Sequence, residues 1–141
     1  MFARDDKASL ITLLETSDTY ERCWLLVHTD EGPILACAWY RPPGETLDGI
    51  KTFESELERL RPQAVSTLII GDMNVHFRKW LVHSGCKDNT AGRFLYEIAT
   101  KAGLKQIVRA PTRMGNLLDL VLTDMIRRPQ KLGAKYGTTI M

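Results

Sequence analysis

The chain has 141 residues, of which 44% are hydrophobic and 26% are charged, and its formal net charge is +2. This composition is that of one globular domain or a piece of a larger one, and it excludes an intrinsically disordered chain. The near-neutral total neither requires nor excludes nucleic acid as a partner, because phosphate binding needs a local basic surface and not a basic total.

Two strands are the first elements that the pattern predicts. Residues 1–14 contain no convincing complete element. The β-type runs Cys23–His28 and Ile34–Tyr40 flank residues 29–33, and a connection this short with Asp and Gly favours a hairpin. Residues 41–44, Arg-Pro-Pro-Gly, then end the second strand, because proline cannot donate a hydrogen bond to a neighbouring strand.

A helix and a short strand follow. Hydrophobic residues recur at helical spacing among charged ones before Pro62, namely Ile50, Phe53, Leu57 and Leu60. This is the pattern of an amphipathic helix that ends before the proline. The next run, Thr67–Gly71, is short and apolar, which is typical of a strand buried on both faces.

The second half of the chain repeats this alternation. Thr90 can cap a helix that Gly103 closes. Two strand-like runs, Lys105–Arg109 and Leu117–Thr123, come after it, with a loop at residues 110–116 between them. Strands that alternate with helices after a hairpin predict an α/β layered fold, with a mixed β-sheet and flanking helices.

A carboxylate and an amide stand where the central strand ends. The run Leu68-Ile69-Ile70-Gly71 is followed by Asp72-Met73-Asn74. In an extended chain, residues two apart point to the same side, so Asp72 and Asn74 are candidates for a shared site at the carboxyl end of the strand. A carboxylate can bind a hard cation or accept a proton, and a neutral amide can bind a phosphate oxygen. The alternative is a plain Gly-Asp turn.

Tyr40 and Asp119 are two further candidates at strand ends. The hydroxyl of Tyr40 can reach such a site, and the alternative is an ordinary amphipathic tyrosine at a boundary. Asp119 lies in an apolar run, where a carboxylate is costly unless it is paired or functional. Alternation along a strand can instead turn it to solvent.

A basic and aromatic segment follows the Asp-Asn pair directly. Its residues are His76, Arg78, Lys79, Trp80 and His83. Such side chains suit a nucleic-acid substrate, because they stack on bases and pair with phosphates, although segments of this kind also occur by chance. The seven-residue spacing of the two histidines disfavours a shared metal. Arg109 and Arg113 are further candidates for phosphate contacts, against the ordinary alternative of solvated arginines.

Other kinds of chemistry are disfavoured. There is no glycine-rich phosphate loop, no GxSxG motif and no Cys-His nucleophile pair. Three cysteines without CxxC spacing argue against zinc and disulfides, and favour a reducing intracellular compartment. The longest apolar stretches are too short to span a bilayer, so we expect no membrane partner. The remaining groups are carboxylate, amide and tyrosine, which point to metal-assisted hydrolysis.

An ordered set of blocks carries a family resemblance. In chain order they are Trp39-Tyr40-Arg41-Pro42-Pro43, Ile70-Gly71-Asp72-Met73-Asn74 with His76 and Trp80, Pro111-Thr112-Arg113, and Leu118-Asp119-Leu120-Val121-Leu122-Thr123. The set resembles the endonuclease/exonuclease/phosphatase superfamily, and within it the apurinic-like endonuclease domains of non-LTR retrotransposons. The resemblance covers roughly residues 23–125.

The resemblance implies a fold and an activity. The fold would be a partial four-layered α/β sandwich of the DNase I type. The activity would be Mg²⁺-dependent hydrolysis of DNA, with Mn²⁺ as a possible substitute. The implied partners are DNA, on which the protein would act in the nucleus, and a reverse transcriptase domain in the same polyprotein.

Four residues match the catalytic positions of the family. Asp72 would orient or deprotonate the attacking water, Asn74 would hold the scissile phosphate, and Tyr40 would hydrogen-bond near that phosphate. Asp119 would support the metal or a catalytic histidine. His76, Arg78, Trp80 and Arg113 remain candidates for binding the substrate.

The sequence departs from the family at other catalytic positions. Neither Glu15 nor Glu21 matches the metal-binding Glu, and we find no counterpart of the terminal Ser-Asp-His block. We therefore expect residues 1–141 to be a single partial domain that lacks the family's first strands and this block. Catalysis would then be weak or lost. The alternatives are a non-catalytic nucleic-acid-binding remnant and a phosphatase-type member of the superfamily.

Overall fold

The computed structural model describes residues 10–77, 89–108 and 119–125. Within these ranges the elements are β1 (Ile11–Ser17), β2 (Arg22–Thr29), β3 (Gly32–Tyr40), α1 (Asp48–Leu60), the short 3₁₀ helix η2 (Arg61–Gln63), β4 (Ser66–Asp72), α2 (Thr90–Lys101), β5 (Lys105–Gln106) and β6 (Asp119–Thr123). None of the helices in this part of the chain is long and apolar enough to cross a membrane.

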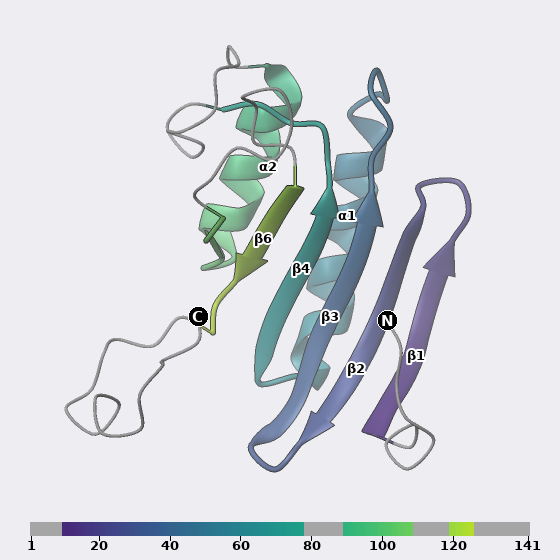
Figure 1. The fold of residues 1–141 in the computed structure, drawn as a ribbon, viewed down its shortest axis with the longest axis vertical. Helices are drawn as coiled ribbons and strands as arrows, with labels where there is room; N and C mark the ends of the chain where they lie inside the picture. Colours follow the sequence, from purple (N-terminus) through teal and green to yellow (C-terminus); the bar gives the residue numbers. More distant parts are fainter. Residues whose placement is uncertain (1–9, 78–88, 109–118, 126–141) are drawn as a thin grey trace, which may run out of the picture.

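The strands form one mixed sheet in the order β1-β2-β3-β4-β6-β5 (Figure 1). β1, β2 and β3 pair antiparallel, β3 and β4 pair parallel, and β6 runs antiparallel to both β4 and β5. The parallel pair requires a crossover, which α1 provides between the two strands. The mixed sheet with flanking helices that the sequence predicts is therefore confirmed.

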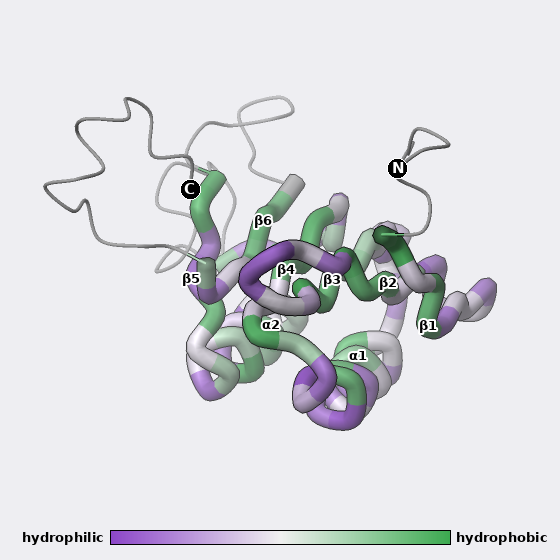
Figure 2. The backbone as a smooth tube through the Cα atoms, turned by 90° about the horizontal axis from the view of Figure 1, so that it is seen from below, coloured by the Kyte–Doolittle hydropathy of each residue, from purple (hydrophilic) through white to green (hydrophobic). Residues whose placement is uncertain are grey.

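Both α-helices cover the same side of the sheet (Figures 1 and 2). The core lies between the sheet and these helices, and its largest fully buried apolar side chains are Trp24, Leu35, Ile50, Phe53, Ile69, Met73, Leu95, Leu120 and Leu122. The stacked rings of Trp24, Trp39 and Phe53 join β2, β3 and α1. The helices thus pack against one face of β3 and β4, the strands that contain Tyr40 and Asp72.

The predicted hairpin and first helix are confirmed. β2 and β3 pair from Arg22 with Trp39 to Thr29 with Gly32, whose positive φ of 124° closes the turn. α1 buries its hydrophobic stripe and ends one residue before Arg61, and Pro62 follows in η2, as the proline predicts. Gly103, with φ 76°, follows the second helix as predicted.

Several predictions at element boundaries are wrong. A strand, β1, runs through residues 11–17, where the sequence shows no complete element, and a β-bulge between Leu13 and Glu15 breaks its alternation. The cap of α2 is Asn89 and not Thr90, because the Asn89 side chain accepts a hydrogen bond from the amide of Gly92. The strand expected at Lys105–Arg109 is regular only over residues 105–106.

The central strand β4 is also not buried on both faces. Thr67 and Ile69 are buried under the helices, whereas Ile70 is 46% exposed on the opposite face. An apolar run predicts burial, but it cannot show how many layers cover the strand.

Candidate active site at the ends of strands β3 and β4

Three of the predicted site residues lie in one row across the sheet. Tyr40 is the register partner of Asp72 in the parallel pair β3 and β4, and Asp72 is the register partner of Asp119 in the antiparallel pair β4 and β6. Tyr40 and Asp72 are the last residues of their strands, and Asp119 is the first residue of β6. The main chain therefore brings together three positions that lie far apart in the sequence.

Asn74 joins this row through a turn and not through an extended strand. β4 ends at Asp72, and Asn74 has a positive φ of 47°, so the expected alternation of residues two apart does not hold here. The turn instead directs the main-chain amide of Asn74 toward Asp72, whose Oδ1 accepts it at 3.3 Å. Asparagine is among the residues that tolerate this left-handed conformation best.

The side chains of this group differ in their surroundings. Tyr40 is 43% exposed, so its ring is open to solvent. The amide of Asn74 is partly buried, and its Nδ2 donates to the carbonyl of Arg41 at 2.7 Å. An amide nitrogen carries two hydrogens, which leaves one for a further acceptor such as a phosphate oxygen.

Arg41 also lies at this strand end, although in the sequence it is only part of a strand stop and of a family motif. It is 4% exposed, and its guanidinium lies against the main-chain carbonyls of Met73 and Asn74. In the sequence it stands between a tyrosine and two prolines, and this position does not indicate burial. Arginine at the end of a strand is usually solvated, so burial was not predictable from the residue type.

His76 lies where the chain leaves the turn toward α2. Its main-chain N–H donates to Oδ1 of Asn89 and its carbonyl accepts from the amide of Asn89, which ties it to the start of the helix. Gly92 packs directly against this carbonyl, where a Cβ atom would overlap it. Burial lowers the pKa of the His76 imidazole below its usual 6.5. The ring is therefore held mostly neutral near pH 7.

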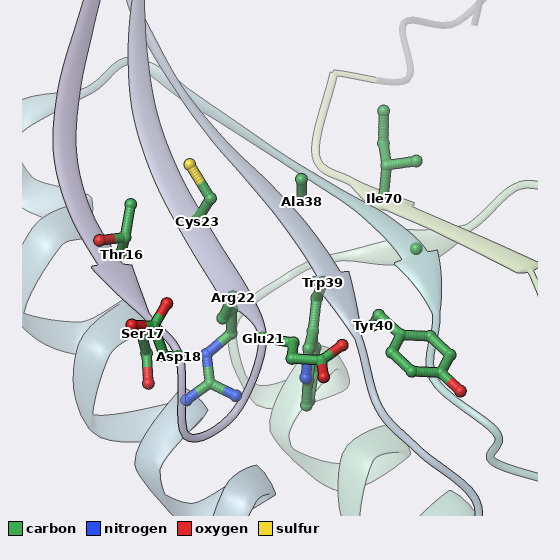
Figure 3. Close-up of a pocket in the computed structure, with 11 residues that line it drawn as sticks. Thr16, Ser17, Asp18, Glu21, Arg22, Cys23, Ala38, Trp39, Tyr40 and Ile70 are labelled. Carbon is green, nitrogen blue, oxygen red and sulfur yellow. The ribbon is translucent and has the colours of Figure 1, made fainter.

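An open pocket of about 780 Å³ lies beside the row, along β1, β2 and β3 and the end of β4 (Figure 3). Tyr40 and Gly71 form the border of the pocket that faces the row, and Asp18 and Glu21 add carboxylates from the turn between β1 and β2. The carbonyl of Glu21 accepts the main-chain N–H of Tyr40 at 3.1 Å, so this turn is attached to the end of β3. The pocket thus has Glu21 near the exposed Tyr40, with Asp18 farther away at the end of β1 (Figure 3).

The residues that the structure describes do not by themselves form a metal site. In residues 10–77, 89–108 and 119–125 no three His, Cys, Asp or Glu side chains lie together so that they could hold a metal ion. Glu15, which precedes Tyr40 in the sequence, is paired instead with Arg59 of α1. Mg²⁺ is usually held by one or two carboxylates together with substrate phosphates and water, so Asp72 could supply one carboxylate but not a complete protein site.

The remaining candidates lie outside the described residues. They are Arg78, Lys79, Trp80, His83, Arg109 and Arg113. The structure thus brings together Tyr40, Asp72, Asn74 and, at the level of the main chain, Asp119. It also places His76 directly after this group.

Comparison with known proteins gives two matches. Residues 34–137 match the sequence model of the family described as endonuclease-reverse transcriptase, which covers most of the chain. Among solved structures, the fold is similar to the endonuclease domain of TRAS1, a telomere-specific non-LTR retrotransposon, with a TM-score of 0.56 and 16% sequence identity. No curated protein sequence matches the chain.

The structural match covers 79% of this chain and 53% of the TRAS1 domain, so the chain spans about half the length of that domain. At this level of identity the match shows the fold, which is that of a DNase I-like endonuclease domain. The match to the family covers well over half of the sequence, from near the start of β3 past β6. The chain therefore belongs to the endonuclease-reverse transcriptase family.

Proposed function

We propose that this chain provides part of the catalytic site of a DNA endonuclease that hydrolyses phosphodiester bonds with Mg²⁺, or with Mn²⁺ in its place. The site would act on DNA in the nucleus and belong to a polyprotein that also contains a reverse transcriptase. The family of the chain supports this proposal in general terms. The roles of individual residues are argued from the strand ends.

The observation that carries the proposal is the row of Tyr40, Asp72 and Asp119, with Asn74 attached to it by a hydrogen bond. Hydrolysis of a phosphodiester needs a base for the attacking water and donors for the charge that develops on the phosphate oxygens. Asp72 can accept the proton of the water. The hydroxyl of Tyr40 and the second N–H of Asn74 can donate to phosphate oxygens.

The metal is the part of the proposal that the described residues do not support. They do not form a ligand cluster, so we assign no step to the ion. The sequence also matches only four of the family's catalytic positions. We therefore propose that the activity of residues 1–141 by themselves is weak or lost.

A plasmid-nicking assay tests the enzymatic part of the proposal. Purified chain would be incubated with supercoiled DNA in Mg²⁺, in Mn²⁺ and in EDTA, alongside the variants Asp72→Ala and Glu58→Gln. Glu58 is exposed on α1 and serves as a matched carboxylate control. Metal-dependent nicking that Asp72→Ala abolishes and Glu58→Gln preserves would support an endonuclease. If the activity is strong, the claim that it is weak in this chain is wrong.

A second outcome would favour the non-catalytic alternative. In that case the chain binds DNA in a salt-dependent way without cutting it, the binding survives Asp72→Ala, and it weakens on Trp80→Ala. Cleavage of a soluble phosphate monoester but not of DNA would instead favour a phosphatase-type relative.

A further inference from the structure

Arg41 is a buried cation whose hydrogen bonds go to main-chain carbonyls of two separate loops. Nη2 donates to the carbonyl of Glu45 at 2.5 Å, in the segment between β3 and α1. Nη1 lies 3.4 Å from the carbonyls of both Met73 and Asn74, in the turn after β4. The guanidinium therefore bridges the two segments that leave the ends of the parallel pair.

The main chain of Arg41 holds the same turn from the other side. Its N–H donates to the carbonyl of Asp72 at 2.8 Å, which extends the pairing of β3 and β4 by one residue. Its carbonyl accepts Nδ2 of Asn74 at 2.7 Å. Arg41 thus contacts Asp72, Met73 and Asn74 in succession, and it is joined to Asn74 in both directions.

Asn74, which these contacts hold, has an energetically unfavourable main-chain conformation. Asn74 has a φ of 47°, and a left-handed residue other than glycine persists only where its surroundings determine it strongly. Met73 and Val75 on either side are fully buried, which anchors the turn in the core. The hydrogen bonds of Arg41 add polar contacts to this apolar anchoring. They hold the main-chain carbonyl and the side-chain amide of Asn74 in place.

The charge balance at Arg41 shows that simple ion pairing does not explain its burial. Nε of Arg41 lies 3.5 Å from Oε2 of Glu45, yet neither atom has a hydrogen-bond partner among the described residues. Burial lowers the pKa of Arg41 and raises the pKa of Glu45, and their mutual attraction opposes both shifts. A buried pair with such poor geometry adds little stability, so the carbonyl contacts are the better account of this arginine.

We propose that Arg41 is a positioning residue that fixes the left-handed turn at Asn74 and the direction of the Asn74 amide. This inference rests on the proposed function for its relevance to phosphate binding, but not for its geometry. Arg41 acts through Asn74 and does not touch substrate. A lysine at this position would keep the charge and lose the planar fork that reaches three carbonyls at once.

The test compares Arg41→Lys with Glu45→Gln in the full chain. Glu45→Gln removes the charge beside Arg41 but keeps the main-chain carbonyl that Nη2 binds. The readout is the side-chain NH₂ signal of Asn74 in ¹⁵N-correlated NMR spectra. The internal reference is the side-chain NH₂ of Asn89, a residue that does not contact Arg41 and whose Oδ1 accepts hydrogen bonds at the start of α2. A general loss of stability would affect both signals.

We expect Arg41→Lys to shift the Asn74 signal toward that of a free amide and to speed its hydrogen exchange at least tenfold, with Asn89 unchanged. Glu45→Gln should leave both signals in place. If the Asn74 signal is unchanged in Arg41→Lys, or if Glu45→Gln moves it equally, the proposal is overturned.

A measurement on the wild-type chain covers the case in which Arg41→Lys does not fold. A scalar coupling across the hydrogen bond between Nδ2 of Asn74 and the carbonyl carbon of Arg41 is expected, and an Asn74 amide that exchanges like a free one would contradict it. Nicking assays on the same samples address the proposed function separately. A chain that shows the Asn74 signature and does not cut DNA leaves the role of Arg41 intact and shows that residues 1–141 have no nuclease activity by themselves.

Discussion

Arg22 and Glu56 form a two-pronged ion pair between β2 and α1, with Nε to Oε1 at 3.0 Å and Nη2 to Oε2 at 2.8 Å. Nε1 of Trp24 donates to the same carboxylate at 2.6 Å, and the Arg22 guanidinium lies 4.9 Å from the ring centre of Trp39. Arg22 is 2% exposed, so this network is part of the core. The network attaches α1 to the sheet beside β3, the strand that ends at Tyr40.

We expect Glu56→Gln to lower the free energy of unfolding by about 3 kcal/mol, because it leaves the Arg22 charge buried without its counter-charge. Glu58→Gln, at an exposed position of the same helix, should change it by less than about 0.5 kcal/mol. Urea denaturation followed by tryptophan fluorescence measures both. Equal effects of the two variants would show that the buried pair does not stabilise this layer.

Gly71→Ala should destabilise the chain strongly, because a Cβ atom at this position would overlap the carbonyl oxygen of Trp39 in the neighbouring strand. Gly103→Ala is the comparison. It meets no atom nearby, but its φ of 76° costs about 1–2 kcal/mol for an L-residue. Thermal unfolding should show a larger loss for Gly71→Ala. If Gly103→Ala is the more harmful change, β3 and β4 do not approach as closely as described.

Asn89→Ala should lower the free energy of unfolding by about 1–2 kcal/mol, because Oδ1 caps α2 at Gly92 and also binds the amide of His76. Asn89→Asp keeps both acceptor contacts and should retain most of the stability. Thr90→Ala tests the cap that the sequence suggested, and we expect only a small change. A larger effect at Thr90 than at Asn89 would reverse the assignment of the cap.

Stability should decrease as the pH falls through the range in which His76 takes up its proton. Burial lowers the pKa of His76 in the folded state, so the unfolded chain binds the proton more readily below about pH 6.5, and unfolding is favoured there. Glu45 acts in the opposite direction, because burial raises its pKa and the folded state gains from its protonation. The contribution of His76 is therefore isolated by comparing the wild type with His76→Gln.

Denaturation at a series of pH values between 5 and 8 measures this difference. The slope of unfolding free energy against pH should be shallower in His76→Gln. If the two slopes are identical, His76 is not buried as described.

The sequence predicts those elements that are marked by a residue pattern within a short stretch of the chain. The hairpin follows from two β-type runs around a short turn, and α1 follows from its hydrophobic spacing and Pro62. Tyr40 and Asp72 could be predicted to meet, because parallel strands bring their carboxyl ends to one edge.

The parts that it does not predict depend on tertiary contacts. The bulge in β1 interrupts the alternation that marks a strand, and the left-handed turn at Asn74 depends on carbonyl contacts from Arg41, which lies in a different loop. The burial of Arg22 and Arg41 also depends on partners that sequence spacing does not bring near. Residue types set the chemistry of the site, whereas these contacts set its geometry.

The order of strands in the sheet has a consequence for folding. β1, β2 and β3 are neighbours in both sequence and space, whereas the pairing of β4 with β6 closes the longest loop between adjacent strands in the described sheet. Closure of a long loop costs more chain entropy than closure of a hairpin, so we expect the pairing of β4 with β6 to form last and to be the slow step. The row of Tyr40, Asp72 and Asp119 crosses that pairing, and an intermediate with only the first three strands contains Tyr40 without its partners.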